Sequence, residues 1–156
     1  MVDQFHQNAF SYIGRPESKL RTYALFKTAI GMEKYLVEMK NCELRTKYTK
    51  FRLSNHNLMI EKGRHMGLKP EERMCPFCPN AIEDEMHFFL DCQMYREIRA
   101  PLVREAERLN YFFKFLDREQ KFKHFLIDFA WNSVADIIFK SFELRDFLLS
   151  FPKRHD

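Results

Sequence analysis

Three cysteines and one histidine lie close together in the sequence, at spacings that suit metal binding. Cys75 and Cys78 form a C-x2-C pair, His87 follows after eight residues, and Cys92 follows after four more. A closely spaced cysteine pair can offer two thiolates to one ion, and a histidine with a further cysteine completes a tetrahedron. The sequence therefore predicts one structural Zn²⁺ site whose ligands are Cys75, Cys78, His87 and Cys92.

Other uses of these side chains stay open at this point. The four cysteines of the chain could form two disulfides or be ordinary buried thiols, with His87 as a core histidine. Cys42 lies 33 positions before Cys75 and is a substitute ligand that would make a four-cysteine site. His65, just before the loop that leads to the cysteine pair, is another substitute ligand.

A catalytic zinc is a third alternative, and the ligand set disfavours it. Catalytic zinc keeps one position open for water, whereas three thiolates and an imidazole fill the coordination shell. The nearby acids Glu83, Asp84 and Glu85 could act chemically, but acids in the first turn of a helix are also stabilised by its dipole alone. His-Glu-x-x-His is absent, and the cysteine pair precedes the histidine, unlike the order in zinc deaminases. We therefore expect a protein that is not an enzyme.

Hydrophobic residues recur at helical spacing along most of the chain, and no convincing alternation of period two is seen. The sequence thus predicts a mostly α fold, a small helical domain with the zinc site embedded in it. The predicted helices cover residues 19–30, 32–41, 42–54, 80–90, 93–109, 117–129 and 132–150, with a short buried segment at 58–60. Residues 1–17 are predicted to be a flexible arm, and residues 18–156 a single domain with its zinc-binding segment at 72–99.

Two local signals refine these helices. Asp117 with Gln120 and Asn80 with Glu83 both resemble capping boxes, in which two side chains satisfy the free N–H groups at a helix start. The five positions from His87 to Cys92 correspond to about 500° around an ideal α-helix, so these ligands cannot share one helical face. The helix that holds His87 is therefore expected to end or loosen near residues 90–91.

Positive charge is concentrated in one part of the chain. Seven basic residues and one acid lie between Arg45 and Lys69, a local charge of +6, while the whole chain carries +4. Such an asymmetry is typical of a surface that binds a polyanion, although a solvated helix face would look the same. The predicted nucleic-acid contacts are Arg45, Lys47, Lys50, Arg52, His56, Lys62 and Arg64. His56 or Tyr48 could also stack on a base.

Residues 49–99 resemble the zinc-binding C-terminal segment of reverse transcriptases from non-LTR (LINE-type) retrotransposons. The residues that carry the resemblance are Arg52, Ser54, His56, Leu58, Glu61, Gly63, Arg64, Cys75, Cys78, Glu83, Asp84, Glu85, His87, Phe88, Cys92, Tyr95 and Arg99. Residues 18–27 and the Phe-rich tail also resemble flanking sequence in these elements. The resemblance implies RNA or DNA as a partner, with RNA slightly favoured. The polymerase Ala-Asp-Asp signature is missing, and no Pro-Asp with spaced acids follows the zinc motif. The chain should neither polymerise nor cut.

Phenylalanine is abundant, with 17 residues in the chain, and this supports a second function. The aromatic C-terminal third could exceed what one small core can bury, which predicts a homodimer or a larger protein partner. The residues concerned are Phe112, Phe113, Phe115, Phe122, Phe125, Phe139, Phe142, Phe147 and Phe151. No stretch of eighteen uncharged apolar residues is present, so we expect no membrane insertion and an intracellular location.

Overall fold

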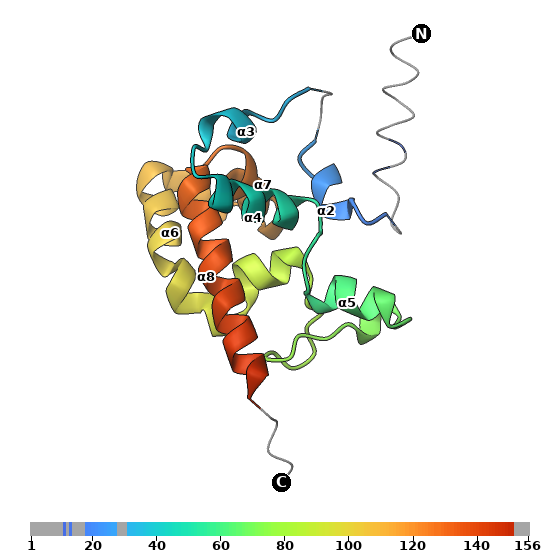
Figure 1. Ribbon diagram of the computed structural model, residues 1–156. Helices are drawn as coiled ribbons and strands as arrows, with labels where there is room; N and C mark the ends of the chain where they lie inside the picture. Colours follow the sequence, from blue (N-terminus) through green and yellow to red (C-terminus); the bar gives the residue numbers. More distant parts are fainter. Residues whose placement is uncertain (1–10, 12, 14–17, 28–30, 152–156) are drawn as a thin grey trace.

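The longest helix, α8 (Trp131–Ser150), organises the domain. Its buried residues Val134, Ala135 and Ile138 recur at helical spacing and form an apolar stripe. Helix α4 (Cys42–Arg52) packs against α8, as do α6 (Arg96–Leu109) and α7 (Arg118–Ile127). Figure 1 shows α8 in red, running along the body of the domain with α6 beside it.

This computed structural model describes residues 11, 13, 18–27 and 31–151. Across these residues the regular elements are helical, and the one β pairing is an isolated bridge between Met74 and Ile82. The prediction of a mostly helical fold is confirmed. The remaining elements are α2 (Arg21–Ala24), α3 (Lys34–Glu38), α5 (Met59–His65), the 3₁₀ turns η1 (Pro70–Glu72), η3 (Gln93–Tyr95) and η4 (Tyr111–Phe115), and the π-helical turn η2 (His87–Asp91).

Several predicted elements are present with small shifts in their ends. The side chains of Asp117 and Gln120 form the predicted capping box at the start of α7, with N···O distances of 2.8 and 3.0 Å. The helix predicted at 93–109 is the 3₁₀ turn η3 followed by α6. The first predicted helix, 19–30, is only the single turn α2, and its last residues, 28–30, lie outside the described part. So do all residues of the predicted arm except Ser11 and Ile13.

The predicted capping box at Asn80 and Glu83 is wrong. Asn80 has φ of +57° and lies in a turn, while the Glu83 carboxylate binds Arg145 and the backbone N–H of Met59 instead. The helix begins later, where the Asp84 carboxylate accepts a hydrogen bond from the His87 N–H at 2.6 Å. Both partners of Glu83 lie far from it in the sequence, so a local pattern could not predict these contacts.

The segment predicted at 58–60 extends into helix α5, with Gly63 inside it rather than after it. A Cβ atom at residue 63 would lie 2.7 Å from the Cγ atom of Arg73. The Arg73 guanidinium donates hydrogen bonds to the carbonyls of Ile60 and Leu68, which fixes its side chain against α5. Gly63 is therefore needed for close packing of the following loop, and it does not mark a helix end.

Aromatic rings fill the centre of the core between α4, η2 and α8. The ring centroids of Phe88 and Phe142 are 4.5 Å apart, and those of Phe51 and Phe88 are 6.0 Å apart. Phe122 packs on the same cluster from α7. Across the described residues, no helix combines the length and the apolar character that crossing a membrane would require.

Candidate metal centre and adjoining basic cleft

The four side chains predicted as metal ligands lie together and could bind a metal ion. One potential ligand atom from each of Cys75, Cys78, His87 and Cys92 lies within 4.8 Å of the others. The Sγ atom of Cys92 is 3.9 Å from that of Cys75 and 3.6 Å from that of Cys78. Cys42 is exposed and lies outside this cluster, as does His65.

A tight turn positions the cysteine pair. The Cys75 N–H donates to the Ala81 carbonyl at 2.7 Å, and the Glu83 N–H donates to the Arg73 carbonyl at 2.9 Å. These two bonds flank the bridge between Met74 and Ile82, and Asn80 turns the chain with its positive φ. The loop from residue 75 to residue 81 is thus closed by its own backbone, which aims both thiols to one side.

His87 and Cys92 are brought together by a π-helical turn. The Cys92 N–H donates to the His87 carbonyl at 2.7 Å, which is the i→i−5 bond that defines a π turn. A separation of five residues does not bring two side chains to the same face of an α-helix, but it corresponds to one turn of a π-helix. The predicted loosening of the helix near residues 90–91 therefore takes the form of a wider turn through Asp91. After it, Cys92 has φ of −57° and ψ of 121° and so lies outside the helical region.

The polar environment of the cluster also fits an ion. The Nε2 atom of His87 is buried and has no hydrogen-bond partner, which suits a nitrogen that faces a metal. The hydrogen bond between the Cys75 and Cys92 sulfurs, together with His87, lowers the pKa of Cys75 despite its burial. The pKa of Cys92 is raised by the same contact with Cys75.

The three acids beside the cluster are all engaged by the protein itself. Glu83 is 1% exposed and forms two hydrogen bonds of 2.8 Å with the Arg145 guanidinium. Asp84 caps the helix that holds His87. Glu85 is buried and accepts hydrogen bonds from other elements. These contacts give each carboxylate a structural role.

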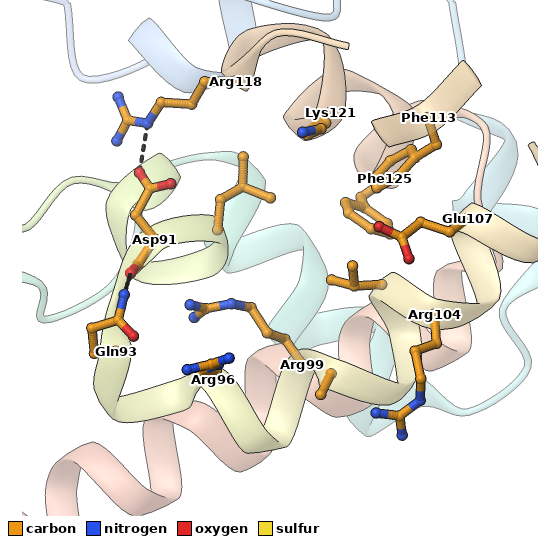
Figure 2. A pocket seen from close by; sticks show the side chains of 13 residues that line it. Asp91, Gln93, Arg96, Arg99, Arg104, Glu107, Phe113, Arg118, Lys121 and Phe125 are labelled. Carbon is orange, nitrogen blue, oxygen red and sulfur yellow. Dashed lines mark hydrogen bonds and ion pairs between the residues drawn. The ribbon is translucent and has the colours of Figure 1, made fainter. Parts of the chain in front are cut away.

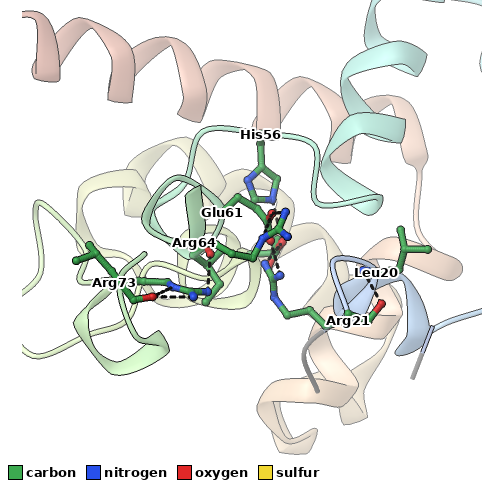
Figure 3. A network of polar contacts seen from close by, with 10 residues as sticks. Leu20, Arg21, His56, Glu61, Arg64 and Arg73 are labelled. Carbon is green, nitrogen blue, oxygen red and sulfur yellow. Dashed lines mark hydrogen bonds and ion pairs between the residues drawn. The ribbon is translucent and has the colours of Figure 1, made fainter. Parts of the chain in front are cut away.

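A polar network around Glu85 and Glu61 joins three separate segments (Figure 3). The Arg21 guanidinium pairs with both Glu61 and Glu85, and His56 contacts Glu85 at 2.9 Å. Arg64 pairs with Glu61 from the same helix. Although burial alone would raise the pKa of Glu85, the hydrogen bond and charge of His56, together with the charge of Arg21, lower it to about 2. The network holds α2 and α5 against the metal-binding segment.

Several predicted nucleic-acid contacts are occupied by internal partners. The side chain of His56 is 4% exposed, Tyr48 is fully buried, and Arg45 donates to the Met39 carbonyl. Arg52 is also buried, and Arg64 is paired with Glu61. Of the seven predicted residues, Lys50 and Lys62 are exposed and have no such partner in the described part of the chain, while Lys47 pairs with Glu43 and lies over the Phe139 ring. The basic stretch therefore contains both buried structural cations and free lysines.

Arg52 is expected to contribute to stability rather than to phosphate binding. It donates to the Leu126 carbonyl at 2.6 Å and to Glu33 at 2.8 Å, and it lies over the Phe26 ring. Arg52→Gln should lower the free energy of unfolding by about 2–4 kcal/mol, because it leaves buried partners unpaired. Lys50→Gln on the same helix should change it by less than about 0.5 kcal/mol. Urea unfolding of both variants tests this, and equal effects would contradict it.

A basic cleft that the sequence did not predict lies between α6, η4 and α7 (Figure 2). Its volume is about 600 Å³. Five cations and two carboxylates line it: Arg96, Arg99, Arg104, Arg118 and Lys121, with Asp91 and Glu107. Ala100 and Val103 also line it, together with buried rings of Phe113 and Phe125. The cleft thus carries an excess of three positive charges.

The cations of the cleft differ in how they are paired. Arg118 is neutralised by Asp91 at 2.6 Å, whereas Arg96 and Arg104 have no hydrogen-bond or ion-pair partner among the described residues. Arg99 is 8% exposed and donates to the carbonyl of the candidate ligand Cys92 at 2.6 Å. The metal-binding segment therefore forms one wall of the cleft. Arg96 and Arg104, which lack a partner within the parts that the structure describes, thus contribute to the lining of a cleft that is open to solvent.

The charges that line this cleft are not evident when acidic and basic residues are summed along the sequence. Residues 96–108 contain four basic and three acidic side chains, so their sum is close to neutral. On a helix, however, Arg96, Arg99 and Val103 share one side, while Arg108 pairs with Glu105 elsewhere. Plotting the charges of α6 on a helical wheel would have placed Arg96 and Arg99 on one side. Lys121 lies on another helix, so its place in the cleft could be found only from the tertiary structure.

No protein-family model, curated protein or solved structure matches the chain. The function is therefore inferred from the geometry of these two adjoining sites.

Proposed function

We propose that the chain is a nucleic-acid-binding module that folds around one zinc ion and has no polymerase or nuclease activity of its own. The observation that carries the proposal is the basic cleft, in which unpaired guanidinium groups lie against the metal-binding segment. The sequence resemblance to the C-terminal region of LINE-type reverse transcriptases supports nucleic acid as the partner.

The donor set supports zinc as the metal. Three sulfurs and one imidazole nitrogen suit Zn²⁺, while Mg²⁺ and Ca²⁺ prefer oxygen. Tetrahedral zinc with Zn–S bonds of 2.3 Å places its sulfurs about 3.8 Å apart. The sulfur separations of 3.6 and 3.9 Å agree with that spacing. Four protein ligands would fill the shell, so the ion would have a structural role.

The basic cleft supports phosphate binding. Guanidinium groups match phosphate oxygens in geometry and keep their charge at all physiological pH values. Arg96 and Arg104 are available to phosphates, and the exposed Lys50 and Lys62 extend positive charge over α4 and α5. Contacts of this kind bind the backbone of a nucleic acid and carry no sequence preference by themselves.

Salt-titrated binding to short RNA and DNA oligonucleotides tests the proposal, with zinc content measured in the same preparation. Arg96→Gln/Arg104→Gln should lower the slope of log K against log salt by about 1.4 for single strands, since each phosphate contact contributes about 0.7. Arg108→Gln/Lys140→Gln removes the same charge from exposed ion pairs outside the cleft and should have a small effect. Lys47→Gln/Lys50→Gln measures how much the lysines of α4 contribute to oligonucleotide affinity.

Two results would contradict this function. Failure of the zinc-loaded protein to bind any oligonucleotide at low salt would exclude it. Equal losses in the cleft pair and the control pair would show that only net charge matters and that the cleft is not a site.

A protein partner or a homodimer is the second candidate function. Phe112, Phe115, Phe147 and Phe151 are more than half exposed, whereas Phe113, Phe122 and Phe125 are buried in the core. The exposed rings favour an additional contact surface. Their separate locations, on η4 and at the end of α8, allow the two candidate functions to be compared with matched variants.

A further inference from the structure

The 3₁₀ turn η4 presents an exposed group of aromatic rings. Tyr111, Phe112 and Phe115 have 66%, 68% and 68% of their surface exposed, and we call these three residues the η4 aromatic face. The Tyr111 centroid is 5.6 Å from that of Phe112 and 6.1 Å from that of Phe115. Single exposed apolar residues are common, but three touching rings within five residues form a patch.

The geometry of a 3₁₀ helix explains why these rings point outward while Phe113 is buried. With three residues per turn, side chains three positions apart lie above one another. Phe112 and Phe115 therefore share one side of η4, and Tyr111 shares another with Lys114. The third side holds Phe113, which is 2% exposed and lines the basic cleft. One short element thus contributes both to the cleft and to the exposed aromatic face.

Positive charge connects the two surfaces. The Lys114 Nζ atom lies 4.4 Å from the Tyr111 centroid and 4.9 Å from the Phe115 centroid. The Lys114 carbonyl accepts a hydrogen bond from Lys121, which lines the cleft. Exposed rings next to a lysine and to a basic cleft are the combination that single-stranded nucleic acid requires, because its bases stack while its phosphates bind cations. A base-paired duplex keeps its base faces inside the helix and cannot use the rings in this way.

We propose that the module binds single-stranded nucleic acid, with phosphates in the basic cleft and bases stacked on the η4 aromatic face. This inference rests on the proposed function and specifies the strand form that it recognises. Neither His56 nor Tyr48 can provide stacking, because both side chains are buried. The η4 aromatic face takes that role.

Fluorescence anisotropy with labelled single strands of RNA and DNA, and with a duplex of the same sequence, tests the inference at fixed low salt. Phe112→Ser/Phe115→Ser should weaken single-strand binding by about tenfold or more, because each stacked base contributes strongly to affinity. Duplex binding should change less than twofold. Phe112→Tyr/Phe115→Tyr keeps both rings and should retain single-strand affinity. The RNA and DNA arms distinguish the two possible sources of the strand.

Phe147→Ser/Phe151→Ser is the matched control, because its rings are similarly exposed but lie on and after α8. It should leave both affinities unchanged. The inference is overturned if Phe112→Ser/Phe115→Ser has no effect, or lowers single-strand and duplex affinity equally.

Sedimentation of the same variants shows whether the η4 aromatic face instead binds a second copy of the chain. A dimer that dissociates in Phe112→Ser/Phe115→Ser without loss of single-strand affinity would assign the η4 aromatic face to a second copy and overturn the inference. Salt-dependent binding that responds only to the cleft arginines would leave the proposed function intact while refuting stacking. Absence of all oligonucleotide binding, by contrast, would already be seen with the unmodified chain.

Discussion

Cys92→Ser is expected to destabilise the protein more than any other single substitution considered, by several kcal/mol. Structural zinc contributes about 10–16 kcal/mol of apparent binding free energy in small zinc-finger peptides. Cys92 is fully buried, its sulfur lies 3.9 and 3.6 Å from those of Cys75 and Cys78, and its carbonyl accepts a hydrogen bond from Arg99. Thermal unfolding with and without a chelator, alongside metal analysis, measures the effect. The chelated native protein should resemble the Cys92→Ser variant.

Cys42→Ser is the matched control for this experiment. Cys42 is the one cysteine outside the cluster, and it is exposed at the start of α4. Its substitution should leave both the zinc content and the unfolding temperature nearly unchanged. If a chelator fails to lower the stability of the native protein, or if zinc is present at well below one ion per chain, the structural zinc site is refuted.

Arg145→Met should lower the free energy of unfolding by about 3–5 kcal/mol, because it leaves the Glu83 carboxylate buried without its cation. Both side chains are at most 3% exposed, and two hydrogen bonds of 2.8 Å join them. The pair also connects α8 to the loop beside the metal ligands. Urea unfolding in a double-mutant cycle with Glu83→Gln measures the coupling.

The double variant separates pairing from packing. Glu83→Gln/Arg145→Met should be more stable than Arg145→Met alone, since it no longer buries an unpaired charge. Arg108→Met, in the exposed pair with Glu105, is the control and should leave stability nearly unchanged, because solvent screens such a pair. Additive losses in the cycle would show that the Glu83–Arg145 contact contributes no coupling.

Local signals allowed some features to be predicted from the sequence. The four ligand candidates were recognisable because coordination of one ion requires particular atoms at short spacing. The capping box of Asp117 and Gln120 and the apolar period of α8 are likewise complete within a few turns of chain. In each case the interacting residues are neighbours in sequence, so the pattern contains the whole interaction.

Features that depend on distant partners were not predictable. Arg52 and His56 looked like surface cations because their partners, Glu33 and Glu85, lie 19 and 29 positions away. The π turn between His87 and Cys92 depends on a hydrogen-bond register that hydrophobic spacing does not record. The basic cleft required α6 and α7 to be placed side by side. The predicted phosphate contacts were therefore chosen by linear charge density, which does not distinguish buried cations from free ones.

The order in which the chain is synthesised matters for this fold. The four candidate metal ligands lie within residues 75–92, so their loop can close soon after it leaves the ribosome. The helical body can assemble only later, because Tyr48 binds the Leu126 carbonyl and Glu83 binds Arg145, which are synthesised much later. If the cluster binds an ion as proposed, metal capture can precede assembly of the body during translation. A nascent chain halted before α8 would then bind the ion while α4 still lacked the surface on which it packs.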